Sequence, residues 1–179
     1  MTYSLSIITT IYLFTGIIYL GLKKQRYSHI KHTISELGEK GGKNSHHASY
    51  GLFLPVGILL LLISLLSGEN KMVQGFSACV SAGYILSAFF PCDVGSPVEG
   101  GLRQQIHNLA GVIEYAGGAY LLFSAPGKNK ELPYVDYTTI AIIIIACVII
   151  TSIPKIPIRG LTQRIAEVLL FASLIDLTQ

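Results

Sequence analysis

Residues 2–22, TYSLSIITTIYLFTGIIYLGL, contain no charged side chain, and Lys23, Lys24 and Arg26 follow them almost directly. A run of about 20 mostly apolar residues is what a helix needs to cross the hydrocarbon core of a bilayer. A cleaved signal peptide would carry its basic residues before the apolar run and would end in small residues. This stretch shows the reverse order, so we expect an uncleaved first transmembrane helix.

The composition of the whole chain also agrees with the presence of transmembrane helices. Of its 179 residues 51% are hydrophobic and 13% are charged, and the mean hydropathy is +0.56, whereas soluble domains carry about 25% charged residues. A chain of this size cannot bury so much apolar surface in a core of its own. Disordered chains are poor in apolar residues. The composition therefore excludes both classes and indicates a membrane protein.

Six apolar segments have about the length of a membrane span. We expect an all-α bundle of six transmembrane helices, which forms a single integral membrane domain over residues 1–179 of a multi-pass protein of the cell membrane. The second three segments do not repeat the first three, which disfavours an inverted-repeat transporter. The predicted spans cover residues 4–22, 50–67, 72–90, 105–124, 136–153 and 161–178.

The basic residues predict the orientation. Loops rich in Lys and Arg stay on the cytoplasmic side of a membrane. With both termini outside, the inner loops and helix ends hold ten basic residues and the outer ones hold three, so we expect an N-out, C-out topology. The inner ten are Lys23, Lys24, Arg26, Lys31, Lys40, Lys43, Arg103, Lys155, Arg159 and Arg164, and the outer three are Lys71, Lys128 and Lys130.

Charge and cysteine content limit the classes of partner and of stabilising site that we expect. The net charge of +3 is spread over loops, and no basic stripe is interleaved with aromatic residues, so we expect membrane lipids and no nucleic acid as partners. A homo-oligomer or another membrane protein as partner stays open. Cys79, Cys92 and Cys147 are odd in number and lack CxxC spacing, which predicts neither a disulfide framework nor a zinc finger.

Ionisable side chains within the spans are the first candidates for a site, because such groups normally face the interior of a bundle or a water-filled cavity. His107, Gly111, Glu114 and Gly118 have the spacing i, i+4, i+7 and i+11, which places them on one helix face. The two glycines would let a neighbouring helix approach closely. This face is either a packing surface or part of a site.

Arg164 and Glu167 begin the last span at i, i+3 spacing and could form an ion pair. Alternatively, the planar guanidinium of Arg164 could hold a phosphate or a carboxylate.

Three further polar residues fall at the same, cytoplasmic end. Ser35, Glu36 and Asp93 would each be a surface or turn residue if taken alone, but the topology gathers them near His107. We expect a side-chain oxygen of Asp93 or Glu36 about 3 Å from a ring nitrogen of His107, directly or through one water or ion. The candidate catalytic residues are Asp93, His107 and Glu36, the candidate ligand-binding residues are Ser35, Glu114, Arg164 and Glu167, and a bound metal would take Asp93 and His107.

Four sequence elements resemble one family. HTISELG (32–38), FFPCDVG (89–95), HNLAG (107–111) and GLTQRIAE (160–167) are similar to elements of the prokaryotic membrane-protein family catalogued as domain of unknown function 998. The resemblance covers nearly the whole chain. It implies a six-helix fold, the matched positions Ser35, Glu36, Asp93, His107 and Arg164, and no established reaction. Family members often continue with Cys-Pro where this chain has Ser96-Pro97.

A more distant likeness is to the alkaline-ceramidase and progestin-receptor-like hydrolases, which bind zinc through histidines and an aspartate. This chain has six predicted spans rather than seven, and it lacks both a histidine pair in the second span and an HxxxH in the last. Catalytic zinc takes three protein ligands. Asp93, His107 and one of Glu36, Glu114 or Glu167 would have to supply them, so zinc is a cofactor that the sequence does not favour.

Three functions remain open at this stage. The first is an integral membrane protein that binds a lipid or a small amphiphile at the cytoplasmic polar cluster. The second is a membrane-embedded hydrolase or lipid-modifying enzyme, with or without a metal, that uses Asp93, His107 and a glutamate. The third is a small transporter or an assembly partner of other membrane proteins.

Overall fold

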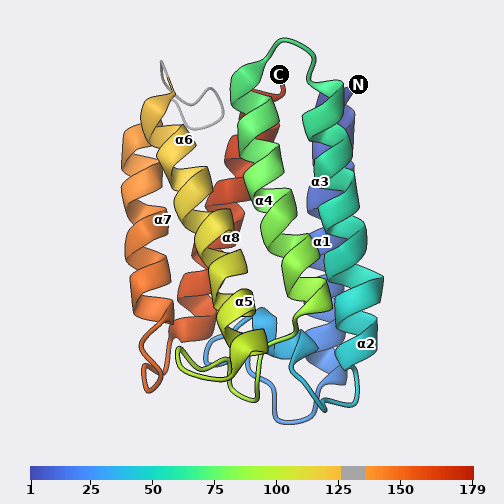
Figure 1. Ribbon diagram of the computed structural model, residues 1–179, viewed down its shortest axis with the longest axis vertical. Coiled ribbons are helices and arrows are strands. Elements are labelled where there is room, and N and C mark those ends of the chain that lie inside the picture. Colours follow the sequence, from blue (N-terminus) through green and yellow to red (C-terminus); the bar gives the residue numbers. More distant parts are fainter. Residues whose placement is uncertain (126–135) are drawn as a thin grey trace.

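A computed structural model describes residues 1–125 and 136–179. Within these residues, six long helical stretches stand side by side, and both chain ends lie at the same end of the bundle (Figure 1). They cover the six predicted apolar segments, and the predicted outer loop with Lys128 and Lys130 lies outside the described residues. The helices are α1 (Thr2–Lys23), the continuous run of α2 (Ser45–Ala48), η2 (Ser49–Phe53) and α3 (Leu54–Leu66), α4 (Lys71–Phe89), the continuous run of α5 (Leu102–Gly111), η3 (Val112–Gly117) and α6 (Gly118–Ser124), α7 (Tyr137–Thr151), and α8 (Arg159–Leu177).

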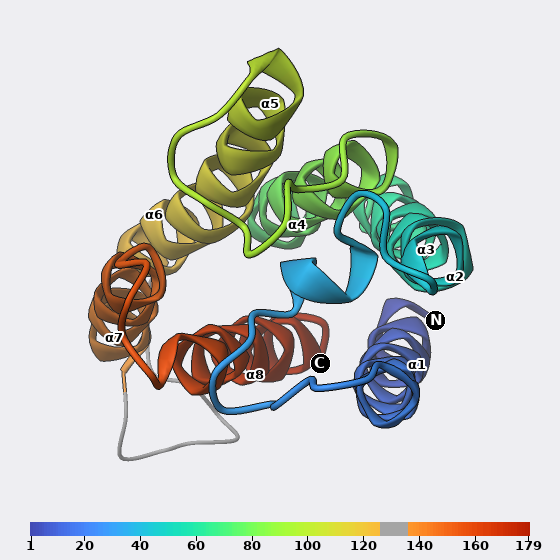
Figure 2. The ribbon, with the colours of Figure 1, turned by 90° about the horizontal axis from the view of Figure 1, so that it is seen from below.

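The six stretches form a closed ring in chain order. Each packs against its neighbour in the sequence, and α8 returns to α1. Seen from the loop end, the short 3₁₀ helix η1 (Ser35–Gly38) lies in the middle of this ring (Figure 2). The loop after α1 therefore folds back under the bundle and closes its lower end.

Three helical stretches are long and apolar enough to cross a membrane, namely Thr2–Lys23, Ser45–Leu66 and Lys71–Phe89, and Tyr137–Thr151 is apolar but shorter. Large apolar side chains are exposed around the ring, among them Ile8, Leu65, Phe123, Ile142 and Val168. Buried polar and charged side chains lie on the inside instead, including Gln104, Glu114 and Glu167. An apolar exterior around a partly polar interior is typical of helices packed in lipid.

Small residues bring helices close together. Ser81 on α4 donates a hydrogen bond of 2.8 Å to the carbonyl of Gly57 on α3, and a Cβ at Gly57 would lie 3.1 Å from the backbone nitrogen of Ile85. A Cβ at Gly118 would come within 2.9 Å of Leu170 on α8. Both glycines are sites of close helix contact, which is how small residues favour association in membranes.

The expected helix contact at Gly111 is wrong, because a Cβ at this position would meet nothing within 4 Å. The prediction extended α-helical spacing from His107 to Gly118, but residues 112–117 form the π-helix η3. A π turn closes i→i+5 hydrogen bonds instead of i→i+4. Gly111 and Gly118 therefore do not share one packed face.

The loop before η1 docks on the first turn of α8. The amide of Leu161 donates a 3.0 Å hydrogen bond to the carbonyl of Ile30. Gly160 makes this contact possible, since a Cβ there would clash with the carbonyl oxygen of His32 and lie 2.8 Å from that of His29. Ile34 and Leu37 are buried beyond this contact. The position of η1 therefore depends on the absence of a side chain at residue 160.

We expect Gly160→Ala to lower the free energy of unfolding in detergent by about 1–3 kcal/mol, because overpacking against backbone atoms forces the loop to move. The matched control is Gly51→Ala, since a Cβ at this helical glycine meets nothing within 4 Å. Thermal and denaturant unfolding of the two purified variants measure the difference. Equal stabilities would show that the loop does not need this close approach.

Candidate functional site

Two carboxyl groups lie buried against each other in the middle of the ring. Glu114 on η3 is 6% exposed and Glu167 on α8 is 1% exposed. Both side chains line the same small space between the helices. A carboxylate can only accept hydrogen bonds, so a buried carboxyl group needs donors from the surrounding helices.

Two buried tyrosines complete the surroundings of Glu167. Tyr84 on α4 donates its hydroxyl hydrogen to Oε1 of Glu167, and Tyr115 on η3 donates to Oε2 over 2.6 Å. Gln163 donates to the Tyr115 oxygen over 3.2 Å and accepts from the amide of Ile34 over 2.7 Å. We call Glu114, Glu167, Tyr84, Tyr115 and Gln163 the carboxyl cluster.

Local backbone structure makes room for the carboxyl cluster. Gly83 on α4 faces Glu114, and a Cβ at this glycine would lie 2.5 Å from Oε2 and 3.0 Å from Cγ of that side chain. Glu114 and Tyr115 are neighbours within the π-helix η3, and both are buried. Single π turns occur often at functional sites.

Arg164 does not pair with Glu167, so the predicted i, i+3 ion pair is wrong. One of its terminal nitrogens donates to the carbonyls of His29, His32 and Gly160 over 2.7, 3.0 and 2.8 Å. The other donates over 2.6 Å to Tyr27, whose pKa burial raises to about 12 against the lowering effect of Arg164. Arg164 therefore donates hydrogen bonds to backbone carbonyls and to Tyr27 instead of pairing with the carboxylate of Glu167.

The direct hydrogen bond predicted between His107 and a carboxylate is also wrong. Nδ1 of His107 lies 3.0 Å from the carbonyl oxygen of Phe90. Asp93 pairs instead with Arg103, and its own amide donates to Gln104 over 2.6 Å. These contacts fasten the loop after α4 to the first turns of α5.

Glu36 has a local partner as well. Its carboxylate accepts hydrogen bonds from the amide of Thr33 at 2.9 Å and from the Thr33 hydroxyl at 3.2 Å. The Thr33 hydroxyl in turn accepts from the amide of Glu36 at 3.3 Å. This reciprocal pattern is a capping box, which satisfies the free amides at the start of a helix. In the HTISELG element, Glu36 therefore stabilises η1.

Among residues 1–125 and 136–179, no group of three His, Cys, Asp or Glu side chains could hold a metal ion. The Cys92 thiol donates to the carbonyl of Ser35 over 3.3 Å, and burial raises its pKa to about 12. This thiol is thus a protonated structural donor at neutral pH.

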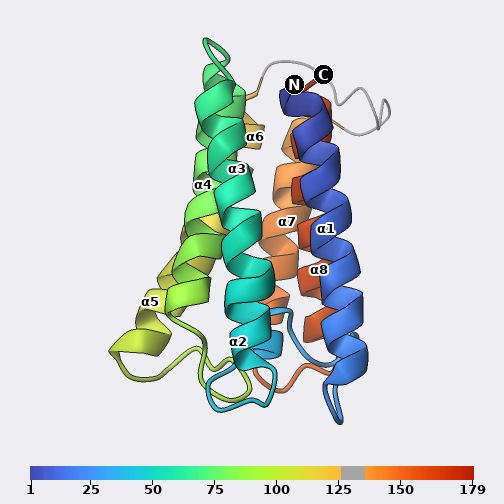
Figure 3. The ribbon, with the colours of Figure 1, turned by 90° about the vertical axis from the view of Figure 1, so that its right-hand side faces the viewer.

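Two neighbouring cavities open between the helix Leu102–Ser124 and α7, and together we call them the lateral groove. The polar cavity, about 240 Å³, reaches Ser35, His107, Glu114 and Gln163. The apolar cavity, about 340 Å³, lies further along the same two helices and is lined by Ala116, Ala119, Tyr120, Phe123, Ala141, Ile142 and Ile145. Figure 3 shows the first turns of α5 leaning away from the rest of the bundle at the loop end.

Four of the seven predicted site residues therefore converge. Ser35, His107 and Glu114 line the polar cavity, and Ser35, Glu114 and Glu167 line a small space of about 20 Å³ beside it. Glu36, Asp93 and Arg164 are engaged in the local contacts described above. Sequence reasoning missed Tyr84, Tyr115 and Gln163, although hydroxyl and amide groups in predicted spans were a signal that each needs a partner.

One family model matches nearly the whole chain. It is described as a protein of unknown function (DUF998) and matches residues 7–178. No curated protein and no solved structure matches the chain.

We expect Tyr115→Phe and Tyr84→Phe each to destabilise the protein by about 1–3 kcal/mol, because each leaves a buried carboxylate oxygen with one partner fewer. Tyr120→Phe is the matched control, since Tyr120 is 70% exposed. Unfolding of the three variants in the same detergent measures the difference. If Tyr115→Phe is as harmless as Tyr120→Phe, the carboxyl cluster does not stabilise the bundle.

Proposed function

The chain belongs to the DUF998 family of proteins of unknown function, and from its geometry we propose that it is a six-span integral membrane protein that binds a lipid or another small amphiphile in the lateral groove. The observation that carries this proposal is the order of polarity along that groove. Its two cavities lie one after the other along the same pair of helices, and they differ in chemistry in the way the two ends of an amphiphile differ.

Successive turns of both helices support the continuity of the groove. On the helix Leu102–Ser124, the lining passes from Asn108 and Val112 in the polar cavity to Ala116 and Tyr120 in the apolar cavity. These positions follow one another along the same helix, which passes through the π-helix η3 between the two cavities. On α7 the lining passes from Ser152 and Val148 to Ile145 and Ile142. An acyl chain could therefore extend from one cavity into the next.

The floor of the polar cavity supports binding of a polar head. Glu114 and Tyr115 reach this cavity and belong to the carboxyl cluster. Ligand sites combine mostly apolar walls with a few placed polar groups that fix the orientation. The lateral groove has both kinds of lining, and its apolar cavity faces the belt of exposed apolar side chains through which a lipid would enter.

Charge and chain direction support the proposed orientation, with both termini outside. The loops that follow α1, α4 and α7 lie together at one end of the bundle, and the termini lie at the other (Figures 1 and 2). These loops and the adjoining helix ends carry Lys23, Lys24, Arg26, Lys31, Lys40, Lys43, Arg103, Lys155 and Arg159. An excess of Lys and Arg favours the cytoplasmic side.

The binding proposal is tested with Ala116→Trp, which fills the lateral groove from its exposed side. We expect this variant to retain several-fold less co-purifying lipid than the wild type, measured by mass spectrometry, because the indole occupies the space of an acyl chain. Ala78→Trp is the matched control, since Ala78 is also an exposed alanine, on α4, and does not line the groove. Equal lipid content in the two variants would contradict the proposal.

The orientation is tested by cysteine labelling in a background in which Cys79, Cys92 and Cys147 are replaced by alanine. We expect Asn44→Cys to react with an impermeant maleimide only after the cells are permeabilised. Glu69→Cys, in the turn between α3 and α4, should react in intact cells. The opposite labelling pattern would show that the basic loops lie outside.

A further inference from the structure

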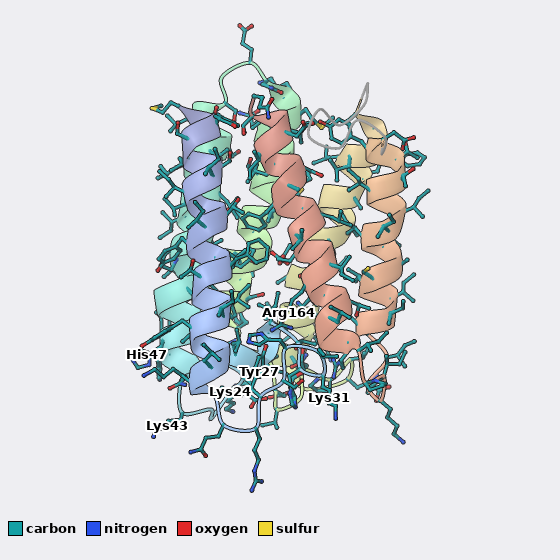
Figure 4. The ribbon with its side chains drawn as sticks, turned by 180° about the vertical axis from the view of Figure 1, so that it is seen from behind. Lys24, Tyr27, Lys31, Lys43, His47 and Arg164 are labelled. Carbon is teal, nitrogen blue, oxygen red and sulfur yellow. The ribbon has the colours of Figure 1, made fainter. Side chains whose placement is uncertain are left out.

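A third, larger cavity lies at the loop end of the bundle, and we call it the basic cavity. Its volume is about 570 Å³, and its walls come from the loops after α1, α4 and α7. Five cationic side chains line it, from two of these loops and the first residue of α8: Lys24, Arg26, Lys31, Lys155 and Arg159. Figure 4 shows Lys24, Tyr27, Lys31 and Arg164 gathered at this end.

The positive charge of the basic cavity exceeds what its own acidic residues neutralise. Glu39 pairs with Lys24 at 2.7 Å and also accepts from the amide of Gly95 at 3.0 Å. Glu36 is used by the capping box. Lys24 is thus neutralised by Glu39, and Arg159 donates hydrogen bonds to backbone carbonyls. The side chains of Arg26, Lys31 and Lys155 form neither ion pairs nor hydrogen bonds within the described part of the chain.

Arg159 contributes a charge that is fixed in place. It is 7% exposed, and its guanidinium donates to the carbonyls of Thr151, Gly95 and Ser96 over 3.1, 2.9 and 2.9 Å. A guanidinium has five N–H donors, so these three bonds leave two for a ligand. Arginine held in this way suits the oxygens of a phosphate.

The basic cavity adjoins the head end of the lateral groove. In the loop after α4, Gly95 and Pro97 line the basic cavity, whereas Ser96 and Val98 line the polar cavity. After α7 the same change occurs between Ser152 in the polar cavity and Pro154 in the basic cavity. Arg159 binds both of these segments and therefore sits at the junction.

We propose that the basic cavity binds a phosphate group, carried by the amphiphile whose chain lies in the lateral groove. This inference rests on the function proposed above. Three cations without protein partners and one fixed arginine supply charge-assisted hydrogen bonds, which are the strongest that a phosphate can accept. The volume of about 570 Å³ leaves room for a headgroup around the phosphate.

The test measures binding of three probes to the purified full-length protein in a neutral detergent. The probes are dioleoyl phosphatidic acid, dioleoylglycerol with the same chains and no phosphate, and glycerol 3-phosphate with no chains. We expect phosphatidic acid to bind at least about tenfold more tightly than dioleoylglycerol, since each basic residue near an anionic headgroup contributes to affinity. Glycerol 3-phosphate should bind more weakly than phosphatidic acid.

The double variant Lys31→Gln with Lys155→Gln should remove this preference for phosphatidic acid. Lys40→Gln with Lys71→Gln is the matched control, because both lysines are exposed and neither lines the basic cavity. A preference that survives in the first double variant would overturn the phosphate site.

The remaining outcomes separate this inference from the proposed function. If both lipids bind equally and Ala116→Trp weakens both, the phosphate site is refuted and the amphiphile groove stands. If glycerol 3-phosphate binds as tightly as phosphatidic acid and Ala116→Trp changes neither affinity, the phosphate comes from a soluble compound and the amphiphile is refuted. Binding of none of the three probes would refute both.

Discussion

The hydrogen bonding of Glu167 is the interaction on which the arrangement of this bundle depends. A carboxyl group enclosed by apolar helices is tolerated only when its oxygens are satisfied from within the protein. Glu167 meets this condition through Tyr84 and Tyr115. These partners come from α4 and η3, so α4, η3 and α8 must meet at one place. Gly83 is the residue that allows α4 to come so close to Glu114.

The same constraint accounts for the lower end of the molecule. Gln163 lies one turn before Glu167 and links the carboxyl cluster to the amide of Ile34. Arg164 holds the carbonyls just upstream, and the capping box of Thr33 and Glu36 shapes the next turn. The HTISELG element is thus fastened to α8 from both sides. It closes the ring from below and contributes Ser35 to the polar cavity.

The helices could be predicted from the sequence because hydropathy acts over a local window, and helices cover all six predicted segments. The site could be predicted only in part. Ionisable residues in apolar segments singled out Glu114 and Glu167 as candidates, and both are buried, but their partners are set by helix contacts that no local pattern specifies. Tyr84 and Glu167, for example, are 83 residues apart. Gly111 was misplaced because a π turn interrupts the α-helical spacing. Arg164 and Asp93 were misassigned because backbone carbonyls and Arg103 compete for them.

The distribution of charge along the groove also gives the proposed ligand a direction. Glu114 in the polar cavity carries no positive charge, and a phosphate buried beside it would lose its hydration without gaining a cationic partner. The basic cavity at the loop end offers unpaired cations instead. Beyond the carboxyl pair, in the opposite direction, the groove is lined by alanine, isoleucine and aromatic side chains. The phosphorylated amphiphile that we propose would therefore lie with its phosphate at the loops and its chain toward the middle of the bundle. In the reversed placement its phosphate would lie away from the cations of the basic cavity.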